Sequence, residues 1–266
     1  MVTVLQIWLG PEMPKYVQRC IEKLNEYVLA HDGKHVIVTD RARDMRGEYE
    51  FRSFGGALQE RLSEIEFEWT ASLVDYARYW ILANHEEEYM YYIDCDCYFM
   101  KDPFEGLLVG GADALSWEIN ETCVLLWNGF IGATKHSFCA REVLYAADRF
   151  IAGNRNVVEA YFGIGPKFIT LLLEEKIRST LVFKEEIVPL RVWPNRLLLG
   201  AVGELFYAYF EGRCGKAEWH EKVLEGISRG CGVHLYHPFY QEFEVLEDAF
   251  AELLDRIDED FSYHTA

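Results

Sequence analysis

The sequence predicts an α/β fold, a Rossmann-like mixed sheet flanked by helices, within a single domain that spans residues 1–266. The chain opens with an apolar strand at Val2–Leu9, an amphipathic helix at Met13–Leu29 and a second strand at His35–Thr39, an order typical of α/β sheets. Tyr89–Ile93 is apolar throughout, as a buried central strand is. No linker or internal repeat divides the chain, and half of its residues are hydrophobic, enough for one large core.

The charge and composition narrow the class of partner. The chain carries a formal charge of −18, whereas nucleic acids and anionic lipid surfaces are bound by clustered Lys and Arg. We therefore expect no nucleic-acid partner, and we expect an anionic substrate to bind through a cation. No signal peptide or transmembrane segment is apparent in the sequence. Seven irregularly spaced cysteines suit a reducing compartment, so the predicted location is the cytoplasm.

The remaining regular elements follow from the spacing of apolar residues. Amphipathic spacing predicts helices at Ala57–Ile65, Thr70–Ala83, Ser137–Ile151 and Glu242–Phe261, with Ser137 as an N-cap. Another helix is expected to begin at Gly165-Pro166. Runs of β-branched and aromatic residues predict strands at Ala112–Glu118, Thr122–Trp127, Phe130–Thr134, Val188–Trp193, Leu205–Phe210 and Gly232–Tyr240.

Three stretches predict irregular structure. Arg41–Phe54 is polar and is expected to be a surface loop. The dipeptide Asn128-Gly129 is expected to begin a turn. Arg213–Gly230 is polar and interrupted by glycines, which favours a lid or an acceptor-side loop.

Two carboxylates directly follow the predicted central strand. Side chains two apart on an extended backbone point the same way, so Asp94 and Asp96 are expected to share one polar site. Mg²⁺ or Mn²⁺ would relieve their repulsion and keep open positions for substrate phosphates, at the strand ends where α/β sheets bind ligands. The alternative is an ordinary turn, because Asp is common after strands. A zinc site at Cys95 and Cys97 is disfavoured, since no second Cys/His pair has finger spacing.

Three other residues each allow a structural and a functional interpretation. Asp75 and Arg78 are three apart on a predicted helix. They form either an exposed ion pair or a pair that binds hydroxyls and phosphates of a substrate. Trp8, at the end of the first strand, belongs either to the core or to a face on which a base stacks.

Three polar residues later in the chain remain equally open. Asn128 is either a turn former or a ligand for sugar hydroxyls. His234 and His237 lie near a strand end. They are structural unless one of them meets the Asp94 and Asp96 carboxylates from across the sheet.

Taken together, these stretches resemble glycosyltransferase family 32, whose members carry an Asp-x-Asp sugar-binding region and resemble the catalytic domain of the clostridial glucosylating toxins. The match spans nearly the whole chain, and its motifs occur in the family's order. Val74 departs from it, because the family usually has Ser there. The matching motifs are LQIWLG (Leu5–Gly10), DYARYWIL (Asp75–Leu82), IDCDCYFMKDP (Ile93–Pro103), NGFIGATKHS (Asn128–Ser137), GIGPKFIT (Gly163–Thr170) and VHLYHPFY (Val233–Tyr240).

The resemblance implies a GT-A-type fold and a role for each candidate residue. Asp96 would bind Mn²⁺ or Mg²⁺, and His234 would complete the metal's protein ligands, with His237 as the alternative. Asp94 would contact ribose, sugar or metal. The remaining donor contacts would come from Asp75 and Arg78 to the sugar, Asn128 to its hydroxyls and Trp8 to the base.

The expected function is therefore transfer of a hexose from a UDP- or GDP-sugar to a glycan or another hydroxyl acceptor, with a metal as cofactor. The family retains anomeric configuration, and its motifs here contain no obvious protein nucleophile, so we expect front-face attack by the acceptor. Two alternatives remain. One is a nucleotidyltransferase of related fold, and the other is a non-catalytic protein that binds carbohydrate or nucleotide.

Overall fold

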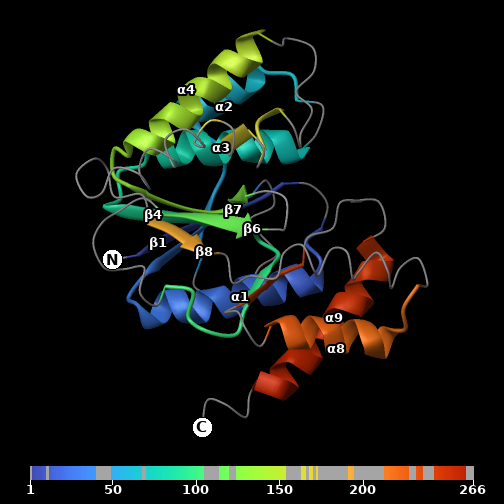
Figure 1. Ribbon diagram of the computed structural model, residues 1–266. Coiled ribbons are helices and arrows are strands. Elements are labelled where there is room, and N and C mark those ends of the chain that lie inside the picture. The colour runs from blue at the N-terminus through green and yellow to red at the C-terminus, as the bar shows by residue number, and fades with distance from the viewer. Residues whose placement is uncertain are drawn as a thin grey trace. The chain divides into compact units, whose positions relative to one another are not determined.

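The computed structural model of the protein describes residues 2–9, 12–39, 49–67, 70–104, 114–119, 124–153, 163–165, 168, 169, 172, 191–194, 213–227, 232–235 and 243–261 (Figure 1). The chain falls into two compact units. The first comprises Met1–Pro11, Val28–Asp94 and Leu107–Pro194, and the second comprises Glu12–Tyr27, Cys95–Gly106 and Asn195–Ala266. The single domain over residues 1–266 stays a prediction.

The first unit contains a seven-stranded mixed sheet in the order β3-β2-β1-β4-β7-β6-β8. Strands β1, β2, β3 and β4 are mutually parallel, β7 runs antiparallel to β4 and β6, and β8 is parallel to β6. This arrangement confirms the predicted fold class. The strands span β1 Thr3–Trp8, β2 Lys34–Thr39, β3 Glu50–Arg52, β4 Tyr89–Ile93, β6 Ala114–Ile119, β7 Val124–Thr134 and β8 Arg191–Pro194.

Helix α1 (Lys15–Ala30) connects β1 to β2, and a tight turn ends it. Asp32 has a positive φ of 50°, and the Gly33 N–H donates to the Val28 carbonyl at 2.8 Å. A Cβ at Gly33 would lie 2.7 Å from that same oxygen, so only glycine fits. The turn sets β2 parallel to β1, with Thr3 opposite Lys34.

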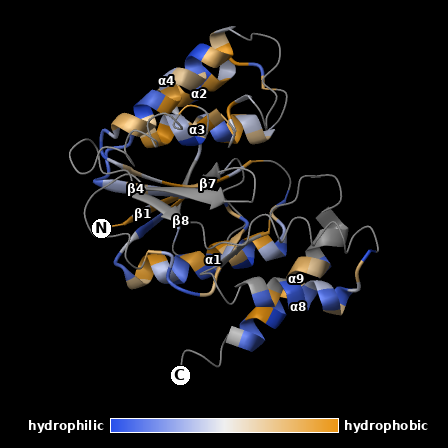
Figure 2. Ribbon diagram, in the orientation of Figure 1, coloured by the Kyte–Doolittle hydropathy of each residue, from blue (hydrophilic) through white to orange (hydrophobic). Residues whose placement is uncertain are grey.

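Three helices cover one face of this sheet: α2 (Gly56–Ser63), α3 (Thr70–Asn84) and α4 (Phe138–Gly153) (Figure 1). The Ser137 hydroxyl accepts from the Ala140 N–H at 2.9 Å, which confirms the predicted N-cap of α4. Figure 2 shows apolar and polar residues interspersed along α4, as in a helix that buries one side. The core between helices and sheet includes Leu5, Val36, Ala77, Tyr92 and Ala147.

The second unit contains a small antiparallel sheet of β5 (Cys97–Phe99) and β9 (Gly232–His234), together with helices α8 (Lys216–Ile227) and α9 (Phe243–Phe261). Its core contains several aromatic rings. The Phe250 ring of α9 lies 5.0 Å from Tyr16 of α1 and 6.3 Å from Trp219 of α8. Such rings bury large apolar areas, which suits a small unit.

Two sequence predictions of loops were wrong. Glu50–Arg52, within the expected surface loop, pairs with β2 as the edge strand β3. Lys216–Ile227, within the expected lid, is the helix α8, and its Lys222 pairs with Glu218 one turn earlier. Residues 41–48 and 228–230 of these two stretches lie outside the described part of the chain, as does the predicted strand Leu205–Phe210.

The expected turn at Asn128-Gly129 was also wrong. Both residues lie inside β7, where the register with β6 shifts: Leu115 pairs with Ile131, but Ser116 pairs with Trp127. Asn-Gly therefore marks an irregularity in a strand. Such bulges bend a strand and often lie beside functional sites.

A buried polar pair links β2 to β1. His35 Nε2 lies 2.8 Å from Gln6 Oε1, and because an amide oxygen only accepts, Nε2 carries the proton and donates. Both side chains are buried. Burial disfavours the charged imidazolium and lowers the pKa of His35 from 6.5 to about 3.

We expect His35 to make the protein less stable in acid. Between pH 6.5 and 3 the unfolded chain binds a proton at His35 and the folded chain does not, so stability falls as pH is lowered through this range. The slope is at most about 1.4 kcal/mol per pH unit. Urea unfolding from pH 7 to 4 should show that His35→Gln, which keeps a donor for Gln6, loses less stability than the wild type. The exposed His136→Asn is the control, and an equal pH dependence in wild type and His35→Gln would contradict the prediction.

Candidate functional site

The carboxyl edge of the sheet brings several predicted residues together in the first unit. β1 and β4 are parallel neighbours, with Leu5 opposite Tyr92, and the chain order reverses at this pair, where α/β sheets bind ligands. Trp8 is the last residue of β1, and Asp94 directly follows β4. In β7, Phe130 pairs with Ile93, so the backbone of Asn128 extends past the same end of β4.

Asp94 is held at this edge by hydrogen bonds from three sides. Its N–H donates to the Gly129 carbonyl at 2.8 Å, and its carbonyl accepts from Gln6 Nε2 at 3.1 Å. Its Oδ1 accepts from the Tyr92 hydroxyl at 2.7 Å. The position of this residue is therefore determined by β1, β4 and β7 together.

Arg78 reaches Asp94 from helix α3. Its Nη1 lies 3.5 Å from Asp94 Oδ1, and its Nη2 lies 2.8 Å from Asp75 Oδ1 one turn earlier in α3. The Arg78 and Asp75 side chains are only 6% and 9% exposed. The interpretation of Asp75 and Arg78 as an exposed ion pair was therefore wrong.

The environment of Arg78 stabilises its charge. Its guanidinium carbon lies 4.3 Å from the centre of the Tyr92 ring. Burial opposes the charge, but Coulombic interactions with Tyr92, Asp75 and Asp94 outweigh it and raise the pKa of Arg78. A permanent cation thus lies buried between two carboxylates at the edge of the sheet.

Two further residues of this edge are only partly placed. Trp8 is half-buried, which suits both a core residue and a stacking face, so its two interpretations stay open. The backbone of Asn128 lies at the carboxyl edge, and its side chain is outside the described atoms.

The second carboxylate, Asp96, belongs to the second unit. The chain does not run extended from Asp94 to Asp96, as the sequence had suggested, because Cys95 and Asp96 form a turn between β4 and β5. The Asp96 carbonyl accepts from the Leu235 N–H at 2.9 Å, and Cys97 pairs with His234. The backbones of Asp96 and His234 are thus neighbours.

Solved structures of glycosyltransferases have a similar fold. The galactosyltransferase LgtC in complex with donor and acceptor sugar analogues matches with a TM-score of 0.51 and 11% identity, over 96% of this chain and 95% of that one. The fold is GT-A. A glycosyltransferase involved in glycosylation of the major capsid of PBCV-1 also matches (TM-score 0.46, 15% identity, 94% and 98% coverage). So does GlyE of Streptococcus pneumoniae TIGR4 (0.49, 12%, 97% and 64%).

The comparisons by sequence add no relative. No protein-family model matches the chain. No curated protein matches it either. Membership of glycosyltransferase family 32 and the function of the Asp-x-Asp motif therefore remain predictions.

The residues of this GT-A chain suit a hard divalent cation. Carboxylate oxygen is the ligand that Mg²⁺ and Mn²⁺ prefer, and Asp96 is half-buried beside the backbone of His234. Asp94 is different, since its Oδ1 already binds Tyr92 and Arg78. Among the side chains that the structure describes, which exclude those of His234 and His237, no three His, Cys, Asp or Glu cluster around a metal position.

Sequence reasoning missed two residues of the GT-A sheet edge. Tyr92 binds both Asp94 and Arg78, and it lies two positions before Asp94, so the alternation of a strand placed both on one face. Gln6 binds the Asp94 carbonyl, and a polar residue inside the buried strand TVLQIW was itself a signal that this position has a polar partner.

None of the helices described here is long and apolar enough to cross a membrane.

Proposed function

We propose that this chain is a metal-dependent glycosyltransferase that moves a hexose from a UDP- or GDP-sugar to a hydroxyl of a glycan or another acceptor. The buried cluster of Asp75, Arg78 and Asp94 at the carboxyl edge of β4 carries the proposal. A permanent cation buried between Asp75 and the partly exposed Asp94 is costly to desolvate, and strongly perturbed ionisable groups cluster at functional sites. Its place at the switch point of a GT-A sheet is where a donor would bind.

Each residue has a role in the proposed reaction. Asp75 and Arg78, on a rigid helix, orient the donor sugar, and Asp94 holds Arg78 and contacts the ribose or sugar. Trp8 stacks on the base, and Asn128 binds sugar hydroxyls. Asp96 and His234 hold Mn²⁺ or Mg²⁺, with His237 as the alternative ligand. When bound, the cation neutralises the charge that develops on the departing diphosphate.

The proposed reaction retains the configuration of the sugar. The bond from the anomeric carbon to the diphosphate oxygen breaks, and a bond from the same carbon to the acceptor oxygen forms on the same face. The proton of the acceptor hydroxyl passes to the departing diphosphate. This front-face route needs no protein nucleophile. The protein side chains contribute by orienting the donor and the acceptor.

Thermal unfolding with candidate ligands tests the proposal. UDP, GDP, UDP-glucose, UDP-galactose and GDP-mannose would each be added with and without Mn²⁺, because a ligand that binds only the folded state raises the unfolding temperature. At a hundred times the dissociation constant, the stabilisation should be about 2.7 kcal/mol. We expect one base to stabilise the protein, and only with the metal present.

The same samples distinguish the alternatives. Incubation of the stabilising nucleotide-sugar with glycan acceptors should release nucleoside diphosphate. Release of pyrophosphate from a nucleoside triphosphate and sugar phosphate would instead support a nucleotidyltransferase. Stabilisation by a nucleotide without turnover would support a binding protein, and no stabilisation by any of these ligands would count against the proposal as a whole.

A further inference from the structure

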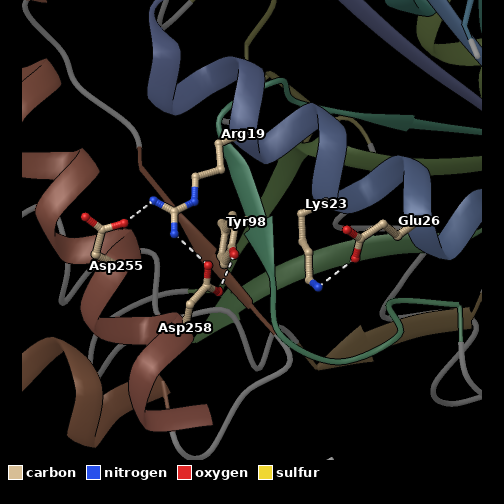
Figure 3. A network of polar contacts seen from close by, with 6 residues as sticks. All are labelled: Arg19, Lys23, Glu26, Tyr98, Asp255 and Asp258. Carbon is tan, nitrogen blue, oxygen red and sulfur yellow. Dashed lines mark hydrogen bonds and ion pairs between the residues drawn. The ribbon is translucent and has the colours of Figure 1, made fainter. Parts of the chain in front are cut away.

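A polar network in the second unit joins helix α1, strand β5 and helix α9 (Figure 3). The Arg19 guanidinium of α1 reaches two carboxylates of α9: its Nη1 lies 2.6 Å from Asp255 Oδ1 and its Nη2 lies 2.6 Å from Asp258 Oδ2. The other oxygen of Asp258, Oδ1, accepts from the Tyr98 hydroxyl of β5 at 2.5 Å. Asp258 is therefore held from both sides, whereas Asp255 touches Arg19 alone among these residues and is 65% exposed.

Strand β5, which carries Tyr98, belongs to a small sheet. It is three residues long, pairs among the described residues with the three residues of β9, and follows the turn that contains Asp96. Two-stranded sheets of this size are marginal in isolation. The Tyr98 ring is only 2% exposed, and its hydroxyl is bound to α9. The Tyr98 hydroxyl thus connects β5 to α9, which takes no part in the pairing of β5 with β9.

We propose that Tyr98 and Asp258 are positioning residues for the metal site. Their hydrogen bond, with Arg19 fixing Asp258, holds β5 against β9 and so keeps Asp96 beside His234. The proposal rests on the proposed role of Asp96 and His234 as metal ligands. None of Arg19, Tyr98 and Asp258 is proposed to contact the metal or the substrate.

Two substitutions test the proposal against one control. Tyr98→Phe keeps the buried ring and removes only the hydroxyl, and Asp258→Asn removes the charge that Arg19 and Tyr98 share. Asp255→Asn removes an equally short pair with Arg19 that does not reach β5. Asp255 and Asp258 both lie on α9 and both bind Arg19, so the two aspartate variants separate loss of the β5 contact from loss of surface charge.

The first readout is hydrogen exchange of the Leu235 amide, which reports the bond to the Asp96 carbonyl without any metal. The second is the dissociation constant of Mn²⁺, titrated in the presence of UDP and, in parallel, of GDP. We expect faster Leu235 exchange and about tenfold weaker Mn²⁺ binding in Tyr98→Phe and Asp258→Asn, since a hydrogen bond to a charged group accounts for about that factor. Asp255→Asn should behave as the wild type within about twofold.

The possible outcomes separate this inference from the proposed function. If Asp96→Asn abolishes Mn²⁺ binding while Tyr98→Phe binds Mn²⁺ as the wild type does, the positioning role is wrong and the metal site stands. If Asp96→Asn itself binds Mn²⁺ normally, the metal assignment is wrong and the inference is overturned with it. If Asp255→Asn weakens Mn²⁺ binding as much as Asp258→Asn does, general loss of charge is the cause and the inference is overturned.

Discussion

Replacing Asp96 with asparagine is expected to lower sugar transfer and donor hydrolysis by about a thousandfold or more. A divalent cation supplies several kcal/mol of charge stabilisation in such a reaction, and a neutral amide is a much weaker ligand than a carboxylate. Thermal unfolding should be nearly unchanged, because asparagine has almost the same size as aspartate and keeps the backbone carbonyl that accepts from the Leu235 N–H. Initial rates at saturating donor, measured across Mn²⁺ concentrations, check the prediction.

A matched control tests whether the loss of sugar transfer is specific to Asp96. Asp260→Asn removes an exposed carboxylate from α9 in the same unit and should leave the rate unchanged. Full activity of Asp96→Asn would end the metal assignment. A large fall in its unfolding temperature would mean that Asp96 has a structural role instead.

Replacing Arg78 with glutamine is expected to destabilise the protein by about 3–5 kcal/mol. The substitution leaves the Asp75 and Asp94 carboxylates beside each other in a buried site without their shared cation, and removing one partner of a buried ion pair has a cost of this size. Urea unfolding at pH 7 measures the effect. Arg61→Gln is the comparison, because Arg61 also binds two carboxylates but is 34% exposed, so its loss should cost about 1 kcal/mol.

A second variant separates stability from function at the same position. Arg78→Lys keeps the positive charge and should recover much of the lost stability. It lacks the planar fork with which Arg78 holds Asp75 and Asp94 at once, so donor binding should stay weak. A lysine variant with a wild-type KM for the donor would show that Arg78 only stabilises the fold.

Local patterns in the sequence were sufficient for much of the scaffold. The continuous apolar and aromatic run of Tyr89–Ile93 predicted β4, the apolar spacing of Thr70–Ala83 predicted α3, and Ser137 predicted the start of α4. Helix α8 was not predicted, because the glycines around it favoured a loop. Its Glu218–Lys222 pair, which has helical spacing, was a signal for the helix. These signals are short-range, so a single chain segment contains all of the information.

Pairings between distant segments could not be predicted in the same way. Glu50–Arg52 became a strand because it pairs with β2. Asn128-Gly129 stayed in β7 because the residues on both sides of it pair with β4 and β6, and because the Gly129 carbonyl accepts from the Asp94 N–H. Intrinsic preferences for strands and turns are weaker than such tertiary contacts. The same reason explains why the predicted ion pair of Asp75 and Arg78 turned out to be buried.

Local sequence patterns were enough to identify the candidate residues: two carboxylates after a buried strand, an acid and a guanidinium one helical turn apart, and a histidine on a late strand. How these residues group depends on the packing of distant segments. Arg78 and Tyr92 engage Asp94, whereas Asp96 lies in the turn before β5, where its carbonyl accepts from the Leu235 N–H. In β5 itself, Tyr98 binds a residue 160 positions away. Side-chain charge and spacing are local properties, but the partner of each charge depends on which distant strands and helices pack together.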